Sequence, residues 1–156
     1  MSHIRMGVIA LFALAPTLAV AGPVFDARLD GAISADDGPQ LGTGLGARVG
    51  LPIDLGPIEV VPEAGTTFWM GDGLIVPDLG ARARFGAAVQ PGAYAHVLFP
   101  LPTPGGPTRG WDAGGSLDVT FLPVDLGVHA GAVTLSGPSM PSRTALVGGL
   151  RVGLTF

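Results

Sequence analysis

The segment that ends at Phe156 alternates between two kinds of residue with a period of two. One face is mostly apolar and reads, in steps of two, Phe156, Leu154, Val152, Leu150, Gly148 and Leu146. The other face reads Thr155, Gly153, Arg151, Gly149, Val147, Ala145 and Arg143. Successive side chains of a β-strand point to opposite sides. The pattern therefore predicts a strand with one apolar face and one face that can hold charge.

Seven further segments show the same alternation. The eight segments are 24–34, 40–51, 58–70, 78–89, 93–101, 111–122, 124–135 and 143–156. In each of them the ionisable side chains fall on one face, and most of the bulky apolar side chains fall on the other. Trp69, Leu98 and Val147 are bulky apolar residues that share the face of the ionisable ones. Their lengths are close to the ~10 residues of a tilted strand that crosses a bilayer. Pro62 is the weak point of the third segment, because proline cannot donate a ladder hydrogen bond.

The charge content excludes several classes of protein. The sequence has 8 arginines, no lysine and a net charge of -4, which gives no basic footprint for nucleic acid. Charged residues make up 13%, about half of the ~25% usual in a soluble domain. The absence of cysteine excludes disulfides, a thiol nucleophile and a lipid-anchored cysteine.

The N-terminus has the features of a secretory signal peptide. Arg5 supplies the positive charge, and residues 7–20 form a short apolar stretch that Pro16 interrupts. Ala19-Val20-Ala21 is a small-x-small cleavage pattern. We expect a signal peptide over 1–21 and one domain over 22–156. An uncleaved anchor helix is the alternative, and it is disfavoured because the stretch is short and contains a proline.

Alternation alone does not say which face meets solvent. In a soluble barrel or sandwich the apolar face is the core, whereas in a membrane barrel the apolar face meets lipid and the polar face lines the interior. The missing lysine favours the membrane version, since water-facing sheets are normally rich in charge. The many glycines and alanines of the polar face also suit a crowded interior better than a hydrated surface.

The apolar face places aromatic side chains near strand ends, as interfacial aromatic girdles require. With the N-terminus on the periplasmic side, one rim is expected to hold Phe25, Phe121 and Phe156. The other rim is expected to hold Phe68, Phe99 and Trp111.

The expected connections alternate in length, as they do in membrane barrels with short periplasmic turns and longer outer loops. The shorter connections are 52–56, 90–92 and 123–125. The longer ones are 35–39, 71–77, 100–110 and 137–142.

Together these features resemble the small eight-stranded outer-membrane β-barrels of the OmpA/OmpX type. The resemblance implies an all-β fold, an eight-stranded antiparallel up-and-down transmembrane β-barrel in the Gram-negative outer membrane. Its implied partners are outer-membrane lipid and the barrel-assembly machinery, the latter through the C-terminal strand that ends in Phe156. The resemblance also implies a monomer. The chain departs from the family in its short loops and high glycine content, and no peptidoglycan-binding domain is expected after the barrel.

The polar faces would bring ionisable side chains into the lumen. The expected interior charges are Asp26, Arg28, Asp30, Arg48, Glu59, Glu63, Arg82, Arg84, Asp112, Asp118 and Arg151. Eight strands enclose a space that side chains just fill, so these nearly balanced charges have to pair. We expect an internal network that plugs the barrel. A narrow gated ion path, in which pairs exchange partners, is the alternative, and a wide channel is not expected.

No cofactor, metal site or catalytic residue is expected. His96 and His129 would point inward, but no spacing of ligands around them supports a metal. The resembling group includes lipid-A deacylase barrels, which use a His and a Ser two residues apart on one strand. Here His129 is followed by Ala130 and Gly131, so that motif is absent and an enzyme is not expected.

Three functions follow from this reading. The first is a structural or interaction protein of the outer membrane with a plugged, charge-paired interior. The second is a low-conductance pore through that interior. The third is a soluble, secreted β-barrel that binds an apolar ligand in its core.

Overall fold

The computed structural model describes residues 19–20, 22–34 and 42–156 of the chain. These residues form ten strands. Their bounds are β1 Ala19–Val20, β2 Val24–Ser34, β3 Gly42–Gly50, β4 Ile53–Asp54, β5 Ile58–Trp69, β6 Leu74–Phe85, β7 Val89–Leu98, β8 Arg109–Phe121, β9 Val124–Gly137 and β10 Met140–Thr155. None of the described residues belongs to a helix long and apolar enough to cross a membrane.

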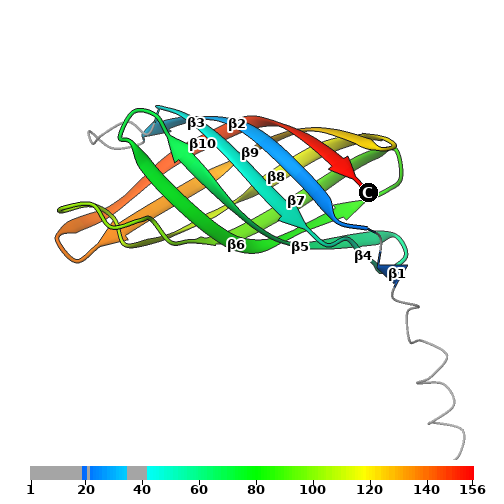
Figure 1. The fold of residues 1–156 in the computed structure, drawn as a ribbon, viewed down its shortest axis with the longest axis horizontal. Helices are drawn as coiled ribbons and strands as arrows, with labels where there is room; N and C mark the ends of the chain where they lie inside the picture. The colour runs from blue at the N-terminus through cyan, green and yellow to red at the C-terminus, as the bar shows by residue number, and fades with distance from the viewer. Residues whose placement is uncertain (1–18, 21, 35–41) are drawn as a thin grey trace, which may run out of the picture.

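The eight longer strands form a closed antiparallel barrel. Each pairs with the next one along the chain, in the order β2, β3, β5, β6, β7, β8, β9, β10. Pairing of β10 with β2 closes the ring, with a register that runs from Val24 opposite Thr155 to Ser34 opposite Ala145. Closure leaves no free edge among these strands, and a bilayer demands this because lipid cannot hydrogen-bond the backbone. Figure 1 shows the resulting barrel, with its strands tilted against the long axis.

The barrel has two ends that differ in their connections. We call the end that holds Val24 and Thr155 the terminal end, and the opposite end the loop end. Residues 51–57, 86–88 and 122–123 connect strands at the terminal end, whereas 70–73, 99–108 and 138–139 do so at the loop end. The connection over 35–41, also at the loop end, lies outside the described residues.

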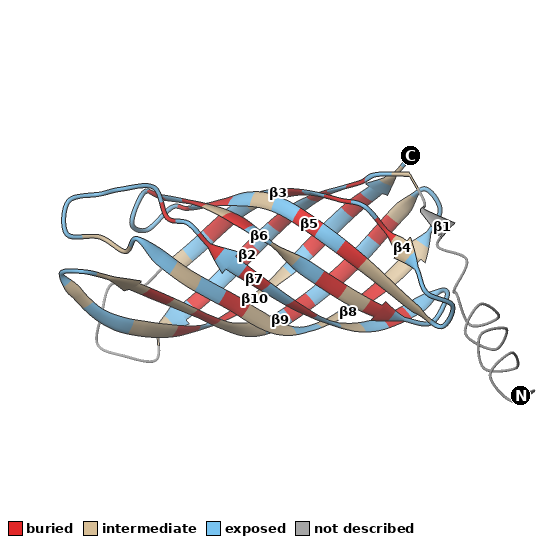
Figure 2. Ribbon diagram, turned by 90° about the horizontal axis from the view of Figure 1, so that it is seen from below, coloured by how far each residue is buried: buried red, intermediate tan, exposed pale blue. Residues whose placement is uncertain are grey.

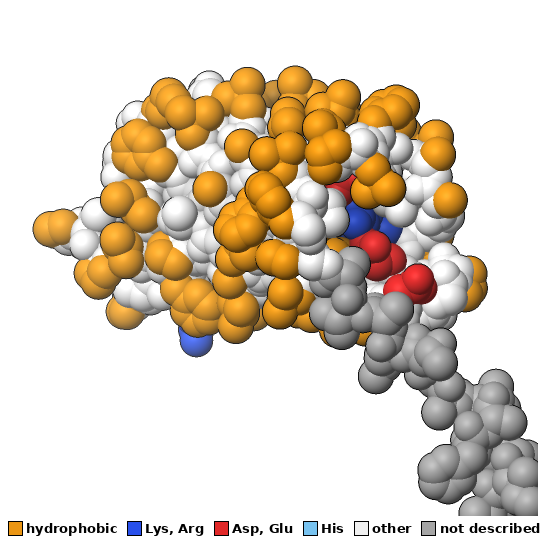
Figure 3. Space-filling model, turned by 45° about the vertical axis from the view of Figure 1, so that its right-hand side comes forward, with side chains coloured by type: hydrophobic (Ala, Val, Ile, Leu, Met, Phe, Trp, Pro, Cys, Tyr) orange, Lys and Arg blue, Asp and Glu red, His pale blue; other side chains and the backbone are white. Residues whose placement is uncertain are grey.

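The barrel is inside-out compared with a soluble protein. Leu45, Val128 and Leu150 are exposed at 48%, 48% and 57% on the outer wall, whereas Arg82 and Glu63 are each only 4% exposed. Alternate bands of exposed and buried residues follow every strand in Figure 2. In Figure 3 hydrophobic side chains cover most of the visible wall, and a cluster of charged side chains shows at one end of the barrel. An apolar wall around a polar interior is the arrangement of a barrel that spans an outer membrane.

The aromatic side chains expected in the girdles lie outside, toward the two ends of the strands. All six expected girdle residues are exposed, by between 42% and 74%: Phe25, Phe68, Phe99, Trp111, Phe121 and Phe156. At the terminal end the rings of Phe25 and Phe156 meet edge to face, with centroids 5.7 Å apart, across the seam where β2 meets β10. Phe85 adds a further exposed aromatic residue at the end of β6.

The expected boundaries were wrong for the fourth and fifth segments. The expected turn over 90–92 lies inside β7, and the chain turns instead over 86–88. Gly86 has a φ of 100°, which favours glycine at a tight turn. Gln90 is buried in the lumen and donates a hydrogen bond to the Gly86 carbonyl. The other end of β6 also differs, because the strand begins at Leu74, four residues before the expected start at 78.

Two short strands were not expected. β4 lies in the connection between β3 and β5, and it pairs with β5 and with β1. β1 comprises Ala19 and Val20, which belong to the expected signal peptide over 1–21. The rest of that expected segment, 1–18 and residue 21, lies outside the described residues.

Reversing the polarity of the outer wall tests the inside-out arrangement. Val128 lies near the middle of the apolar outer face of β9, so Val128→Arg is expected to cost about 2–4 kcal/mol of unfolding free energy in lipid. The measurement is denaturant unfolding of the barrel in lipid vesicles, with Val128→Leu as the control of similar position. Equal stabilities of the arginine and leucine variants would mean that this face does not meet lipid.

Candidate functional site

The lumen collects the ionisable side chains of the barrel. Ten of the eleven expected interior charges are buried: Asp26, Arg28, Asp30, Arg48, Glu63, Arg82, Arg84, Asp112, Asp118 and Arg151. The eleventh, Glu59, is half-buried near the terminal end, with 26% of its side chain exposed. These eleven side chains come from six different strands, so they meet only because the barrel closes.

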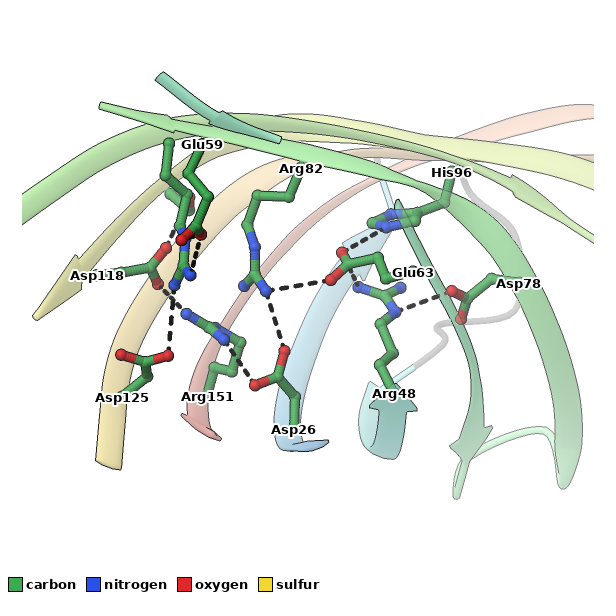
Figure 4. A network of polar contacts seen from close by, with 12 residues as sticks. Asp26, Arg48, Glu59, Glu63, Asp78, Arg82, His96, Asp118, Asp125 and Arg151 are labelled. Atoms are coloured by element: carbon green, nitrogen blue, oxygen red, sulfur yellow. Dashed lines mark hydrogen bonds and ion pairs between the residues drawn. The ribbon is translucent and has the colours of Figure 1, made fainter. Parts of the chain in front are cut away.

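A chain of alternating charges crosses the lumen. Arg151 lies 2.7 Å from both Asp118 and Asp26, and Arg82 lies 3.1 Å from both Asp26 and Glu63. The contact between Asp26 on β2 and Arg82 on β6 joins strands that are not neighbours in the sheet. Figure 4 shows these side chains reaching toward one another from opposite walls. The network therefore ties the barrel together across its interior as well as around its circumference.

Arg48 extends the network toward the loop end. Its guanidinium donates a 2.8 Å hydrogen bond to Asp78 and lies 4.0 Å from Glu63 and from Asp112. His96 lies 2.8 Å from Glu63 and completes the surroundings of that carboxylate. Buried charges are tolerated only when paired and hydrogen-bonded, and each of these side chains meets a partner of opposite charge or a ring nitrogen.

Two smaller clusters complete the polar lumen. Near the terminal end Arg84 pairs with Glu59 and lies 3.4 Å from Asp125. Deeper in the lumen, Asp30 lies 3.4 Å from Arg28 and 3.1 Å from His129.

Tyr94 fills the space between the two histidines. Its ring centroid is 5.5 Å from that of His96 and 5.8 Å from that of His129. Its hydroxyl is buried and has no hydrogen-bond partner among the described residues.

The expected near-balance of charge was wrong, because two buried acids had been left out. Asp78 and Asp125 lie in the lumen at 5% and 1% exposure. The interior thus holds eight carboxylates against five arginines within the described residues. Both acids lie near the expected ends of segments, at positions 78 and 125, where the sequence fits a connection between strands as well as it fits a strand. Their parity was the available signal, because Asp78 has the phase of Arg82 and Asp125 has the phase of His129.

Glycines make room for the charged side chains. A Cβ atom on Gly65 would overlap the Arg48 side chain and the backbone beside it. A Cβ atom on Gly127 or Gly153 would likewise overlap an interior carboxylate. The glycine content of the polar faces therefore follows from the width of an eight-stranded barrel, whose interior has little space beyond its own side chains.

A group of apolar side chains lines the lumen toward the loop end, and the alternation pattern does not predict it. We call this group of buried side chains the apolar layer; it comprises Ala32, Trp69, Leu74, Val76, Leu98, Val133, Leu135, Ala145 and Val147. These residues have the same phase as the charges on their strands, so alternation alone places them in the lumen but does not distinguish them from the charged network. Alternation places Trp69 and Val147 on the polar faces, but whether they join one apolar layer depends on which strands meet across the lumen.

The interior leaves little free volume. Two voids lie among the network residues, and each measures about 20 Å³. A void of this size holds about one water molecule. Among the described residues, no group of three or more His, Asp or Glu side chains is arranged to hold a metal ion.

Comparison with known proteins bears on the fold. No protein-family model and no curated protein sequence matches the chain. Among solved structures, the outer membrane enzyme PagL matches with a TM-score of 0.58 and 18% identity, over 85% of this chain and 99% of that one. Neisserial surface protein A (NspA) matches with a TM-score of 0.54 and 16% identity, over 88% and 99%. The chain has the fold of the small outer-membrane β-barrels.

A third solved barrel of this fold matches a similar share of the chain. The N-terminal β-barrel domain of Pseudomonas aeruginosa OprF matches with a TM-score of 0.52 and 15% identity, over 88% of this chain and all of that domain. These small outer-membrane barrels include an enzyme, a surface protein and a domain of a larger protein. The shared fold therefore does not assign an activity, which has to be argued from the lumen and the barrel mouth.

Removing one arginine tests the network. Arg82→Met would leave Asp26 and Glu63 with fewer partners, so we expect a loss of about 3 kcal/mol in unfolding free energy, the lower end of the range for broken buried pairs. The double variant Arg82→Met with Glu63→Gln is expected to lose less unfolding free energy than the sum of the losses of the two single variants. Arg109→Met, on an exposed arginine, is the control and should change little. Additive costs in this double-mutant cycle would contradict the pairing.

Filling one glycine tests the space around the network. Gly65→Ala is expected to destabilise the barrel by about 1–3 kcal/mol, because the new methyl group displaces Arg48. Gly115→Ala is the matched control, since a Cβ there has 3.7 Å to its nearest neighbour, the Gly92 carbonyl oxygen. Unfolding of both variants in lipid vesicles measures the difference. Equal stabilities would show that the lumen is not tightly filled at Arg48.

Proposed function

We propose that the protein is a structural or interaction component of the Gram-negative outer membrane: a sealed, lipid-embedded barrel with no steady path for ions. The observation that carries the proposal is the filling of the lumen by two stacked plugs, the paired charges and the apolar layer. Two voids within this filled lumen measure only about 20 Å³ each.

The two plugs act in different ways. The charged network supplies many polar atoms. These atoms could coordinate an ion in transit if the paired side chains separated. The only polar side-chain group of the apolar layer is the indole N–H of Trp69, and a constriction lined by apolar side chains excludes water and so stops ions. Because Trp69 and Leu98 are 5% exposed and lie together in this layer, an ion entering from the terminal end meets a dry barrier before the loop end.

The burial pattern opposes the soluble alternative. A secreted barrel with an apolar ligand would need an apolar core and a polar wall, whereas here the wall is apolar and polar or charged residues outnumber hydrophobic ones among the buried residues. The non-enzymatic character is part of the proposal. His129, the histidine closest in sequence to the deacylase pattern, lies in the lumen beside Arg28 and Asp30.

Partners belong to the same proposal. Outer-membrane lipid surrounds the apolar wall, and the barrel-assembly machinery inserts the chain through β10. We propose a monomer, since the barrel closes on itself through β10 and β2 without a second chain. The pore remains the competing function, and it would use the same lumen.

Single-channel recording in planar bilayers separates the two functions. The unaltered protein is expected to give no steady conductance. Trp69→Ala combined with Leu98→Ala removes bulk from the apolar layer, so water can reach the charged network from both ends and brief openings should appear.

The control uses the adjacent residues on the same two strands. Phe68→Ala combined with Val97→Ala removes similar side chains from the outer wall, where they are 42% and 53% exposed. This control is expected to stay closed. Steady conductance of the unaltered protein, or equal behaviour of the two double variants, would overturn the sealed barrel in favour of the pore.

A further inference from the structure

We propose that the mouth of the barrel at the loop end is a binding site for a small amphiphile that carries a carboxylate on a medium-length apolar tail. This inference goes beyond the structural role proposed above. It concerns the space on the loop-end side of the apolar layer, which is not filled by the charged network or by the apolar layer itself.

The site is a cavity of about 290 Å³ in the mouth of the barrel. Its floor is the upper surface of the apolar layer, contributed by Leu74, Val133, Leu135 and Ala145. One wall is the β7–β8 connection, over residues 103–107. Its volume is far larger than that of the two voids deeper in the lumen, and its apolar floor suits a hydrocarbon group.

Arg143 gives the cavity a positive charge. It lies at the start of β10 and lines the cavity at half-burial, and no ion pair or hydrogen bond joins it to another described residue. All five arginines of the lumen, in contrast, lie against carboxylates. Among the described residues no carboxylate pairs with this half-buried guanidinium. It is therefore suited to a carboxylate ligand, which it can hold with two parallel hydrogen bonds.

The backbone at Arg143 is irregular. The pairing of β10 with β9 shifts register between Met140 and Arg143, which marks a bulge or similar irregularity. Such irregularities redirect side chains and are frequent beside binding sites. Here both residues that flank the shift line the cavity, so the irregularity and the cavity coincide.

An acid on the rim refines the choice of ligand. Asp72, in the β5–β6 connection, also lines the cavity but is exposed to solvent. Water and salt weaken an exposed charge more than a half-buried one. Arg143 therefore makes a negatively charged headgroup the preferred one, and Asp72 weakens this preference only slightly.

The size of the cavity limits the tail. Its volume is close to the lower end of the roughly 300–1,000 Å³ of pockets that hold drug-sized ligands. A tail of about eight carbons is suitable, whereas the two or more long chains of a membrane lipid exceed the space. Octanoate is therefore the probe, with octanol and octylamine as probes of equal tail and different charge.

Two methionines provide an internal control for partition into lipid. Met140 lines the cavity, whereas Met70, in the β5–β6 connection, is 49% exposed and lies outside the lining. The full chain, extracted from membranes and placed in phosphatidylcholine nanodiscs, would carry carbon-13 in its methionine methyl groups. Spectra of Met70→Leu and Met140→Leu assign the two signals.

Octanoate is expected to shift the Met140 methyl signal saturably while the Met70 signal moves little. Octanol and octylamine should need at least tenfold higher concentrations for the same shift. Arg143→Gln should weaken octanoate binding roughly tenfold or more, as loss of a charge-assisted hydrogen bond does. Arg109→Gln, on an exposed arginine outside the lining, is the matched control and should leave binding unchanged. Asp72→Asn should strengthen binding slightly.

Several results would overturn the proposal. Equal movement of Met70 and Met140 would show simple partition into the bilayer. Equal binding of octanoate, octanol and octylamine, or unchanged binding by Arg143→Gln, would show that the guanidinium selects nothing. An unmoved Met140 signal would show that the cavity does not bind this class of ligand. These measurements do not depend on the conductance of the unaltered protein. A result that contradicts the binding site can therefore be told apart from one that contradicts the sealed barrel.

Discussion

Lipid cannot solvate a charge, and this constraint shapes the whole interior. The charged side chains of the membrane-crossing strands turn to the lumen, where they are crowded together from seven strands. There they are stable only when paired, so Arg151, Asp26, Arg82 and Glu63 form a continuous series of contacts. The glycines beside them are a consequence of the same constraint, because each leaves the volume that a long guanidinium or a carboxylate occupies.

The lumen is divided into two parts that serve different purposes. The charged part links distant strands through directional contacts, as between Asp26 and Arg82, and so adds order to a ring held mainly by backbone hydrogen bonds. The apolar layer, whose only polar side-chain group is the indole N–H of Trp69, closes the path toward the loop end. The cavity above it depends on this division, since a charged floor would not accept a hydrocarbon tail.

The eight membrane-crossing segments were predictable because alternation is a local property, visible in the residues of each strand alone. The closed all-β fold, its inside-out polarity and the resemblance to small outer-membrane barrels are confirmed. The turn between β6 and β7 was misplaced because Gln90-Pro91-Gly92 and Phe85-Gly86-Ala87 are both plausible turns. Only the pairing of β7 with β8, with Gln90 opposite Asp118, places the first of them inside a strand.

The sequence by itself determined which side of each strand is apolar, that the charges share one face, and that this face has to be internal if the strands cross a membrane. Tertiary structure alone decided which charges meet, because Arg82 and Asp26 are 56 residues apart in sequence and on opposite walls of the lumen. It also decided that Val76, Leu98 and Val133 form a layer rather than three separate inward residues. The physical reason is that contact across a lumen depends on the stagger of strands around the closed ring, and no single strand carries that information.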